Sequence, residues 1–160
     1  MAEGDNPTRR YKWFRPRQAA RGTIIIPNNL SFPIASLFND STGAHVLVVR
    51  DFQFTHFSTT QAMYVQLLQG PQGAAGGSIT PVWPDMGALP GQLYVIDGAG
   101  DLTPDYTFNQ NVASPSWVHN FPFAILPPGW SLCFENFSES PFNLSIFWEA
   151  VEPDELDFVW

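Results

Sequence analysis

The clearest pattern in the chain lies between residues 121 and 151, where apolar side chains occupy every second position. In WSLCFE (residues 130–135) each large apolar residue is followed by a smaller or polar one, and the same period continues over residues 142–148. A period of two is typical of β-strands that bury one face, whereas a helix repeats its apolar positions every three to four residues. This part of the chain is therefore predicted to form half-buried antiparallel strands.

A turn is predicted between the first two of these strands, at Pro127-Pro128-Gly129-Trp130. Pro128 presets the φ angle of the second position of a type II turn, and Gly129 tolerates the positive φ of the third. The chain is therefore expected to reverse its direction at this point.

The rest of the chain repeats this pattern of short strands and turn residues. Pro33 predicts an edge strand or a loop over residues 30–43, the glycines of residues 70–78 predict a flexible loop, and no segment predicts a helix. Strand segments recur about every ten residues. They are residues 22–29, 44–57 (one strand, or a strand with a bend near Arg50-Asp51), 61–69, 79–83, 92–96, 106–108 before a turn at 109–111, and 117–119. Eight to ten such strands predict an all-β fold, a single antiparallel jelly-roll-like β-sandwich.

Composition adds an expectation about the surface. The 160 residues are 44% hydrophobic and 15% aromatic, which excludes a disordered chain, and 14% charged, well below the usual quarter. Such a weakly charged surface indicates that neighbouring subunits cover part of it. An aromatic-rich core in a monomer is the alternative.

Charge divides the chain into a basic beginning and an acidic remainder. Six of the seven basic residues lie in the first 21 positions beside two acids, whereas the other 139 residues hold Arg50 and thirteen acids. Opposite potentials on one chain favour contact between copies or with another charged surface. We therefore divide the chain into an N-terminal arm (residues 1–21), a sandwich domain (22–151) and an acidic, apolar tail (152–160).

The arm is predicted to bind a partner because aromatic residues lie between its basic ones. Its candidate contact residues are Arg9, Arg10, Tyr11, Lys12, Trp13, Phe14, Arg15, Arg17 and Arg21. Such a pattern fits an acidic protein groove, and it also fits nucleic acid, whose bases stack on aromatic rings. We favour protein because the basic run is short; an inert, solvated arm is the third alternative.

The tail, EPDELDFVW, places four acids around apolar side chains that need cover. Burial of each such side chain contributes roughly 1.5 to 3 kcal/mol, so the tail is predicted to pack, either on its own sandwich or across a subunit boundary. Its candidate contact residues are Leu156, Phe158, Val159 and Trp160.

The sequence gives little support for a disulfide, a metal site or a catalytic site. The single cysteine, Cys133, excludes an intramolecular disulfide and a cysteine-based zinc site. The histidines lack the spacing of a cupin metal site, and three aspartates in IDGAGDLTPD lack the spacing of a calcium loop; these residues are His45, His56, His119, Asp97, Asp101 and Asp105. We expect no catalytic residue, no metal and no cofactor.

The turn and the strands around it resemble a known class of proteins. Leu-Pro-Pro-Gly-Trp-Ser-Leu (126–132), followed by a last strand that closes on Phe-Trp-Glu (147–149), resembles the C-terminal half of small jelly-roll virion proteins of tailed bacteriophages. The resemblance implies a repeated subunit on the head, neck or tail of the particle. Head decoration, or cement, is the role we favour, with a homo-oligomer, preferably a trimer, that contacts other virion proteins such as the major capsid or tail protein.

Three other functions stay open beside this one. A receptor- or carbohydrate-binding sandwich of a tail fibre would stack sugars on Trp83 or Trp117; a small capsid protein would turn its arm toward the genome; a cupin-like enzyme would need a metal. The beginning of the chain does not predict a signal peptide, and no apolar run predicts a membrane span. The expected location is the virion, after assembly in the host cytoplasm, without contact to a membrane.

Overall fold

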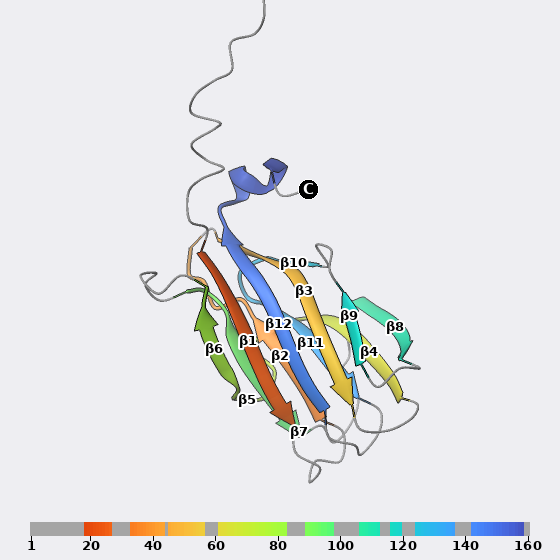
Figure 1. Cartoon of the computed structure of the whole chain (residues 1–160). Coiled ribbons are helices and arrows are strands. Elements are labelled where there is room, and N and C mark those ends of the chain that lie inside the picture. The colour runs from red at the N-terminus through yellow and green to blue at the C-terminus, as the bar shows by residue number, and fades with distance from the viewer. Residues whose placement is uncertain are drawn as a thin grey trace, which may run out of the picture.

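The chain forms two antiparallel β-sheets that lie face to face (Figure 1). The computed structural model describes residues 18–26, 33–43, 45–56, 61–82, 89–97, 106–112, 116–119, 124–136 and 142–158. For residues 33, 56, 61–64, 97, 106–112, 116–119, 136, 155, 157 and 158 it describes the backbone alone. Every strand pairing among these residues is antiparallel, so the predicted all-β sandwich is confirmed.

The first sheet, sheet A, has the order β10-β3-β12-β1-β6, and β9 pairs with β3 beside β10. Its strands are β1 (Gln18–Ile26), β3 (Val46–His56), β6 (Ser78–Pro81), β9 (Ser116–His119), β10 (Ala124–Leu126) and β12 (Phe142–Val151). The longest ladders join β12 to its two neighbours, β1 and β3.

The second sheet, sheet B, has the order β5-β7-β2-β11-β4-β8. Its strands are β2 (Pro33–Phe38), β4 (Gln61–Gln69), β5 (Ala74–Ala75), β7 (Gln92–Asp97), β8 (Tyr106–Val112) and β11 (Trp130–Asn136). A six-residue 3₁₀ helix, η1 (Pro153–Phe158), follows the last strand of sheet A.

The pairing order identifies the sandwich as a jelly roll. The first strand pairs with the last, β2 pairs with β11, β3 with β10, and β4 with β8, as in a long hairpin that has been rolled up. Successive strands change sheet except at the tip of this hairpin, between β4 and β8, and between β9 and β10, which both pair with β3. The segment inserted there adds β5 and β7 to one sheet and β6 to the other, which raises the number of strands in the described residues to twelve, against the eight to ten predicted.

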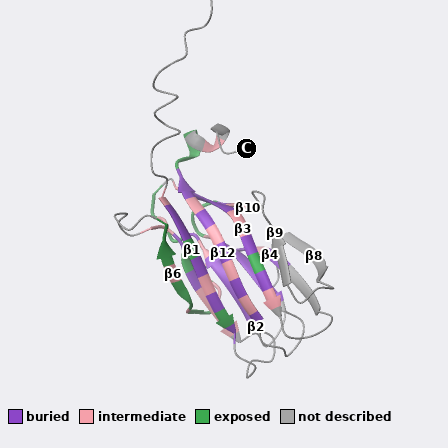
Figure 2. Cartoon of the chain, in the orientation of Figure 1, coloured by how far each residue is buried: buried purple, intermediate pink, exposed green. Residues whose placement is uncertain are grey.

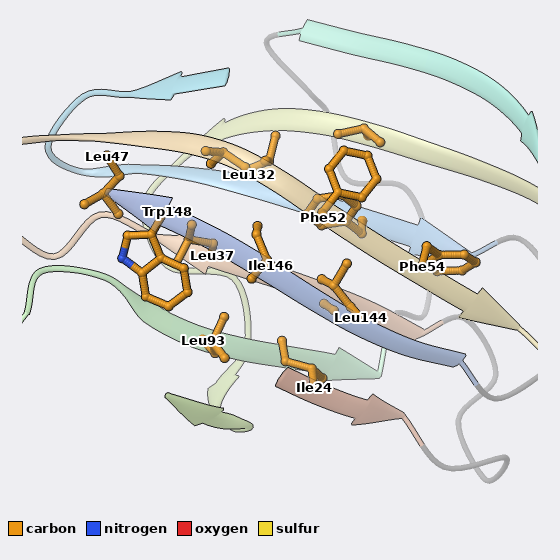
Figure 3. Close-up of a cluster of buried hydrophobic side chains, with 14 of the residues drawn as sticks. Ile24, Leu37, Leu47, Phe52, Phe54, Leu93, Leu132, Leu144, Ile146 and Trp148 are labelled. Atoms are coloured by element: carbon orange, nitrogen blue, oxygen red, sulfur yellow. The ribbon is translucent and has the colours of Figure 1, made fainter. Parts of the chain in front are cut away.

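The core lies between the sheets and receives alternate side chains from each strand. Along β12 the even-numbered residues are buried and most odd-numbered ones are half-buried, as the alternating colours in Figure 2 show. Phe52 of sheet A meets Phe134 of sheet B edge to face, with 4.9 Å between ring centroids. Figure 3 shows residues of both sheets pointing into one interior, among them Leu47, Ile146, Trp148, Leu37, Leu93 and Leu132.

The bend predicted near Arg50-Asp51 is a β-bulge. Phe147 pairs with Asp51 but the next residue, Trp148, pairs with Val49, so one residue of β3 has no opposite residue on β12. The bulge lets Leu47 and Val49 face the core before it and Phe52 and Phe54 face the core after it.

The predicted turn at Pro127-Pro128-Gly129-Trp130 is also present. Gly129 has a φ of 81°, and the Trp130 amide donates to the Pro127 carbonyl over 3.2 Å, which is the hydrogen bond of a type II turn. The turn does not close a hairpin within one sheet, because β10 belongs to sheet A and β11 to sheet B. The chain therefore changes layers here.

Three local predictions were wrong. β2 is an interior strand between β7 and β11, because Pro33 stands at its first position and no hydrogen bond inside the strand is lost. The glycine-rich segment 70–78 contains β5 and the first residue of β6 in place of a structureless loop, and the turn expected at 109–111 is part of β8. Sheet neighbours override the weak strand propensities of these stretches.

Candidate interaction surfaces

Most of the predicted arm lies outside the described residues, and one member of it belongs to the sandwich. β1 begins at Gln18, four residues before the predicted start of the first strand, so Arg21 is a strand residue. The other candidate contact residues of the arm are outside the description: Arg9, Arg10, Tyr11, Lys12, Trp13, Phe14, Arg15 and Arg17.

Arg21 lies on the outer face of sheet A, across two strands from an acid. Its Nη2 is 3.7 Å from Asp51 Oδ1, and its guanidinium lies 5.8 Å from the ring centroid of Phe147, which stands between the two strands in register. The Arg21 side chain is 54% exposed, so water screens the ion pair and it adds little stability. Arg21 is therefore an exposed residue on the outer face of sheet A and belongs to β1, not to the arm.

The tail packs on its own sandwich through η1. Leu156 contacts an apolar cluster formed by Val46, Val48 and Val151, together with Ile125. These three valines point away from the core, onto the outer face of sheet A, yet each is less than 8% exposed. Of the other candidate contact residues of the tail, Phe158 is described by its backbone alone, and Val159 and Trp160 lie outside the described residues.

The arm and the tail join the sandwich at adjacent points. Gln18, the first residue of β1, pairs with Ala150 near the end of β12. The basic residue Arg17 directly precedes Gln18, and the acidic residue Glu152 comes two positions after Ala150. The register therefore brings the point where the basic segment ends and the point where the acidic segment begins to the same end of sheet A, where β1 starts and β12 ends (Figure 1).

Two large apolar side chains among the described residues are exposed. Ile25 of β1 is 72% exposed and Val82, just after β6, is 45% exposed. β6 pairs with Ala20 to Thr23 of β1, so Ile25 lies beyond the end of this ladder. Isolated exposed apolar residues are normal on a protein surface, and these two do not form a described patch.

The outer face of sheet B holds a buried polar row that the sequence did not predict. It consists of Ser36, Gln66, Ser131, Cys133 and Glu135, all at most 5% exposed. Register places Cys133 between Ser36 and Gln66 on neighbouring strands. WSLCFE reads as an alternation of apolar and polar residues, so its strand was predicted to be half-buried, and burial of its second face was not expected. The small size and weak polarity of Ser36 and Cys133 are the one signal in the sequence for burial.

The polar row contains a buried carboxylate with a close donor. Gln66 Nε2 donates to Glu135 Oε2 over 2.6 Å, and Ser131 Oγ donates to the Gly70 carbonyl over 2.6 Å. Gln66 Oε1 and Ser36 Oγ have no partner in hydrogen-bond geometry within the described part of the chain. Ser36 therefore makes only a weak contact with the neighbouring Cys133 thiol and has a small effect on its pKa.

Cys133 is chemically quiet in this setting. Burial raises the pKa of its thiol from 9.0 to about 12; the Ser36 hydroxyl opposes this rise and the charge of Glu135 adds to it. A thiol that keeps its proton is a poor nucleophile and a poor metal ligand. Cys133 is therefore a plain buried thiol.

The other candidates for chemistry do not come together in the described structure. Among described residues, no three side chains of the histidine, cysteine, aspartate and glutamate types form a group that could hold a metal ion. His45 is half-buried beside β3, whereas the side chains of His56, His119 and the three aspartates lie outside the description. Helix in the described residues is limited to η1, which is far too short to span a bilayer.

Comparison with known proteins found no family model, no curated protein and no solved structure that matches the chain.

Proposed function

We propose that this protein is a non-enzymatic structural subunit of a virus particle, which oligomerises and docks its basic arm on neighbouring subunits to decorate or cement the shell. Jelly rolls recur in viral capsids, lectin domains and cupins, so the fold permits this role without deciding it. The resemblance of residues 126–132 and 147–149 to phage virion proteins supports the choice among these classes.

The observation that carries the proposal is the common exit of the two oppositely charged ends. Because Gln18 pairs with Ala150, a basic segment and an acidic one leave the same end of one rigid sandwich. Each subunit thus offers both signs of charge at one end, which suits docking on neighbouring subunits of the shell. Many weak contacts of this kind become persistent when they are repeated over a shell.

The test uses the full chain and the full chain with Arg9→Gln, Arg10→Gln and Lys12→Gln. Light scattering gives the mass of each protein in solution. Cosedimentation with virus particles that salt has stripped of this subunit gives the affinity of each protein for the particle. We expect the same oligomer for both, and binding weakened by about tenfold or more in the variant, which corresponds to roughly 1.4 kcal/mol. Binding of the unchanged chain should fall as salt rises, because salt screens surface charges.

Arg21→Gln is the matched control, because it removes a basic residue from the sandwich and not from the arm. It should bind particles as the unchanged chain does. A monomeric chain that binds no particle and binds glycans would instead establish the sugar-binding alternative and contradict the proposal. Copurified nucleic acid that is lost in the triple variant would indicate a small capsid protein.

A further inference from the structure

The margins of the two sheets differ in how they are protected against pairing with another chain. The outer edge of a terminal strand carries unpaired N–H and C=O groups, so natural proteins shorten such strands or place prolines and charges on them. Among the described strands, β5 and β8 end sheet B, β6 ends sheet A on one side, and β9 and β10 end it on the other, both beside β3. A margin that lacks these protective features indicates a place where a further strand binds.

Three of these margins are protected. β5 has two residues, β9 four and β10 three, so each offers little length for pairing. β6 has four residues and ends in Pro81. The Val82 amide donates to the Ala19 carbonyl over 2.9 Å, and backbone groups alternate between the two sides of a strand, so Pro81 faces the free side. It has no N–H to donate there, which makes β6 a poor template for another strand.

β8 has none of these protective features. Its seven residues, YTFNQNV, contain no proline, no glycine and no charged side chain, and four of them are β-branched or aromatic. The surrounding stretch, residues 106–134, holds no Asp, Glu, Lys or Arg. Figure 1 shows β8 at the margin of the sandwich, where β4 is its one described neighbour in the sheet. A strand of about this length with high strand propensity, low charge and no proline is a typical template for pairing between chains.

We propose that β8 pairs with β8 of a second copy, antiparallel about a two-fold axis, so that sheet B continues from one subunit into the next. This inference names a contact of the proposed homo-oligomer and rests on that part of the proposed function. With complete overlap of the two strands, Tyr106 lies opposite Val112 of the other copy, and Asn109 lies on the axis. Every residue is then opposite one that is an even number of positions away, so the outward backbone groups of the two copies meet.

The composition of β8 suits pairing with itself. A two-fold contact uses the same surface on both subunits and brings side chains near their own copies, where like charges would repel. β8 has no charge to repel, and main-chain hydrogen bonds supply affinity whatever the side chains are. The basic arm of a neighbour is a poorer occupant of this edge, because Pro7 and Pro16 remove two donors and prevent a continuous ladder.

Thiol crosslinking in the full chain tests the pairing. Asn109→Cys places a reactive thiol on the axis, whereas the native Cys133 is fully buried and does not compete. Ile25→Cys is the matched control, because Ile25 is 72% exposed and lies in the other sheet. After treatment with a short thiol crosslinker at low protein concentration, Asn109→Cys should give several-fold more covalent dimer on a denaturing gel than the control. No more dimer than the control would overturn the inference.

A mixture of Thr107→Cys and Asn111→Cys tests the antiparallel register. The two positions lie opposite each other across the axis, so the mixture should give more covalent dimer than either variant alone. A mixture that gives no more dimer than its components would overturn the proposed pairing.

Asn109→Lys provides a measurement that needs no crosslinker. Two like charges at the axis should weaken the dimer several-fold in a light-scattering dilution series. Ile25→Lys is the control and should leave the dissociation constant unchanged. The same dissociation constant in Asn109→Lys as in the unchanged chain would contradict the pairing.

Binding to stripped virus particles separates this inference from the proposed function. Particle binding without crosslinks at position 109 would retain the virion role and reject pairing between copies. Crosslinked dimers that bind no particle would retain the pairing and reject the virion role. A monomeric chain whose particle binding is weakened by Asn109→Lys would assign the edge of β8 to another virion protein, which also overturns pairing between copies.

Discussion

At the scale of single residues, Trp148 shows how one core side chain depends on a glycine. Its indole Nε1 donates to the Pro90 carbonyl over 3.0 Å, and the next residue, Gly91, donates its amide to Asp40 Oδ1 over 2.7 Å. Gly91 has a φ of 112°, and a Cβ built there would lie 2.8 Å from the indole nitrogen. Both the backbone angle and the space therefore require glycine.

Gly91→Ala should destabilise the fold by about 2 kcal/mol or more, because conformational strain and a clash with a buried ring add up. Denaturant unfolding measures the loss. Gly129→Ala is the matched control: its φ of 81° is also unfavourable for alanine, but a Cβ there meets nothing within 4 Å, so strain alone should cost about 1 kcal/mol. Equal losses in both variants would show that the indole does not restrict position 91.

Cys133 makes stability depend on alkaline pH. The unfolded thiol ionises near 9.0, whereas the folded one keeps its proton to about 12, so the folded state binds more protons between these values. Stability contributed by the thiol is therefore complete below pH 9 and falls as pH rises toward 12, by up to about 1.4 kcal/mol per pH unit. The difference between the unfolding free energies of the unchanged chain and Cys133→Ala, followed from pH 8 to 11, measures it. A constant difference would contradict the assigned burial of the thiol.

At the scale of elements, the connections at one end of the sandwich are tied together by Asn39. This residue follows β2 and is fully buried; its Nδ2 donates to the carbonyls of His45 and Leu126, at 3.0 and 2.8 Å. Its backbone also exchanges hydrogen bonds with the turn, donating to the Trp130 carbonyl and accepting from the Gly129 amide. One side chain thus fixes the loop between β2 and β3 against β10 and the turn after it.

Asn39→Asp should cost about 2 to 4 kcal/mol, because a carboxylate of the same shape cannot donate to the two carbonyls and places a buried negative charge beside them; the His45 carbonyl keeps only the Ser41 hydroxyl as a side-chain donor. Thermal or denaturant unfolding at neutral pH measures the loss. Gln72→Glu makes the same chemical change at an amide whose bonds to the carbonyls of Gln69 and Gly70 are weaker and nearer to solvent. A loss at position 39 no larger than at position 72 would contradict this role.

At the scale of the whole molecule, stability is greatest in the middle of each sheet. β12 lies between β1 and β3, and β11 lies between β2 and β4 with both of its faces buried. In the described structure β5 and β6 pair on one side only and are largely exposed. Local opening should therefore begin at these edge strands.

Hydrogen exchange tests this gradient. Amides of residues 132–135 and 144–148 should exchange through global unfolding alone, which for such domains costs on the order of 5 to 15 kcal/mol. Amides of residues 78–80 should exchange many times faster in the same sample and serve as the internal reference. Faster exchange in β11 than in β6 would contradict the assigned sheet order.

The sequence by itself determined the fold class, the last strands and the turn at Pro128-Gly129. These features depend on local rules: a period of two selects a strand, and proline followed by glycine selects the turn angles. Packing of Leu156 could be predicted from its apolar side chain. The sequence left open whether its own sandwich or a neighbouring subunit would cover it.

Only the tertiary structure decided how these elements combine. The interior position of β2, the strands within residues 70–78 and the buried row around Cys133 all depend on neighbours that are distant in the chain. The meeting of Gln18 with Ala150 has the same origin, since strand pairing joins residues more than a hundred positions apart. Local patterns specify which face of a strand is apolar, but the partners that bury it are chosen by packing of the whole chain.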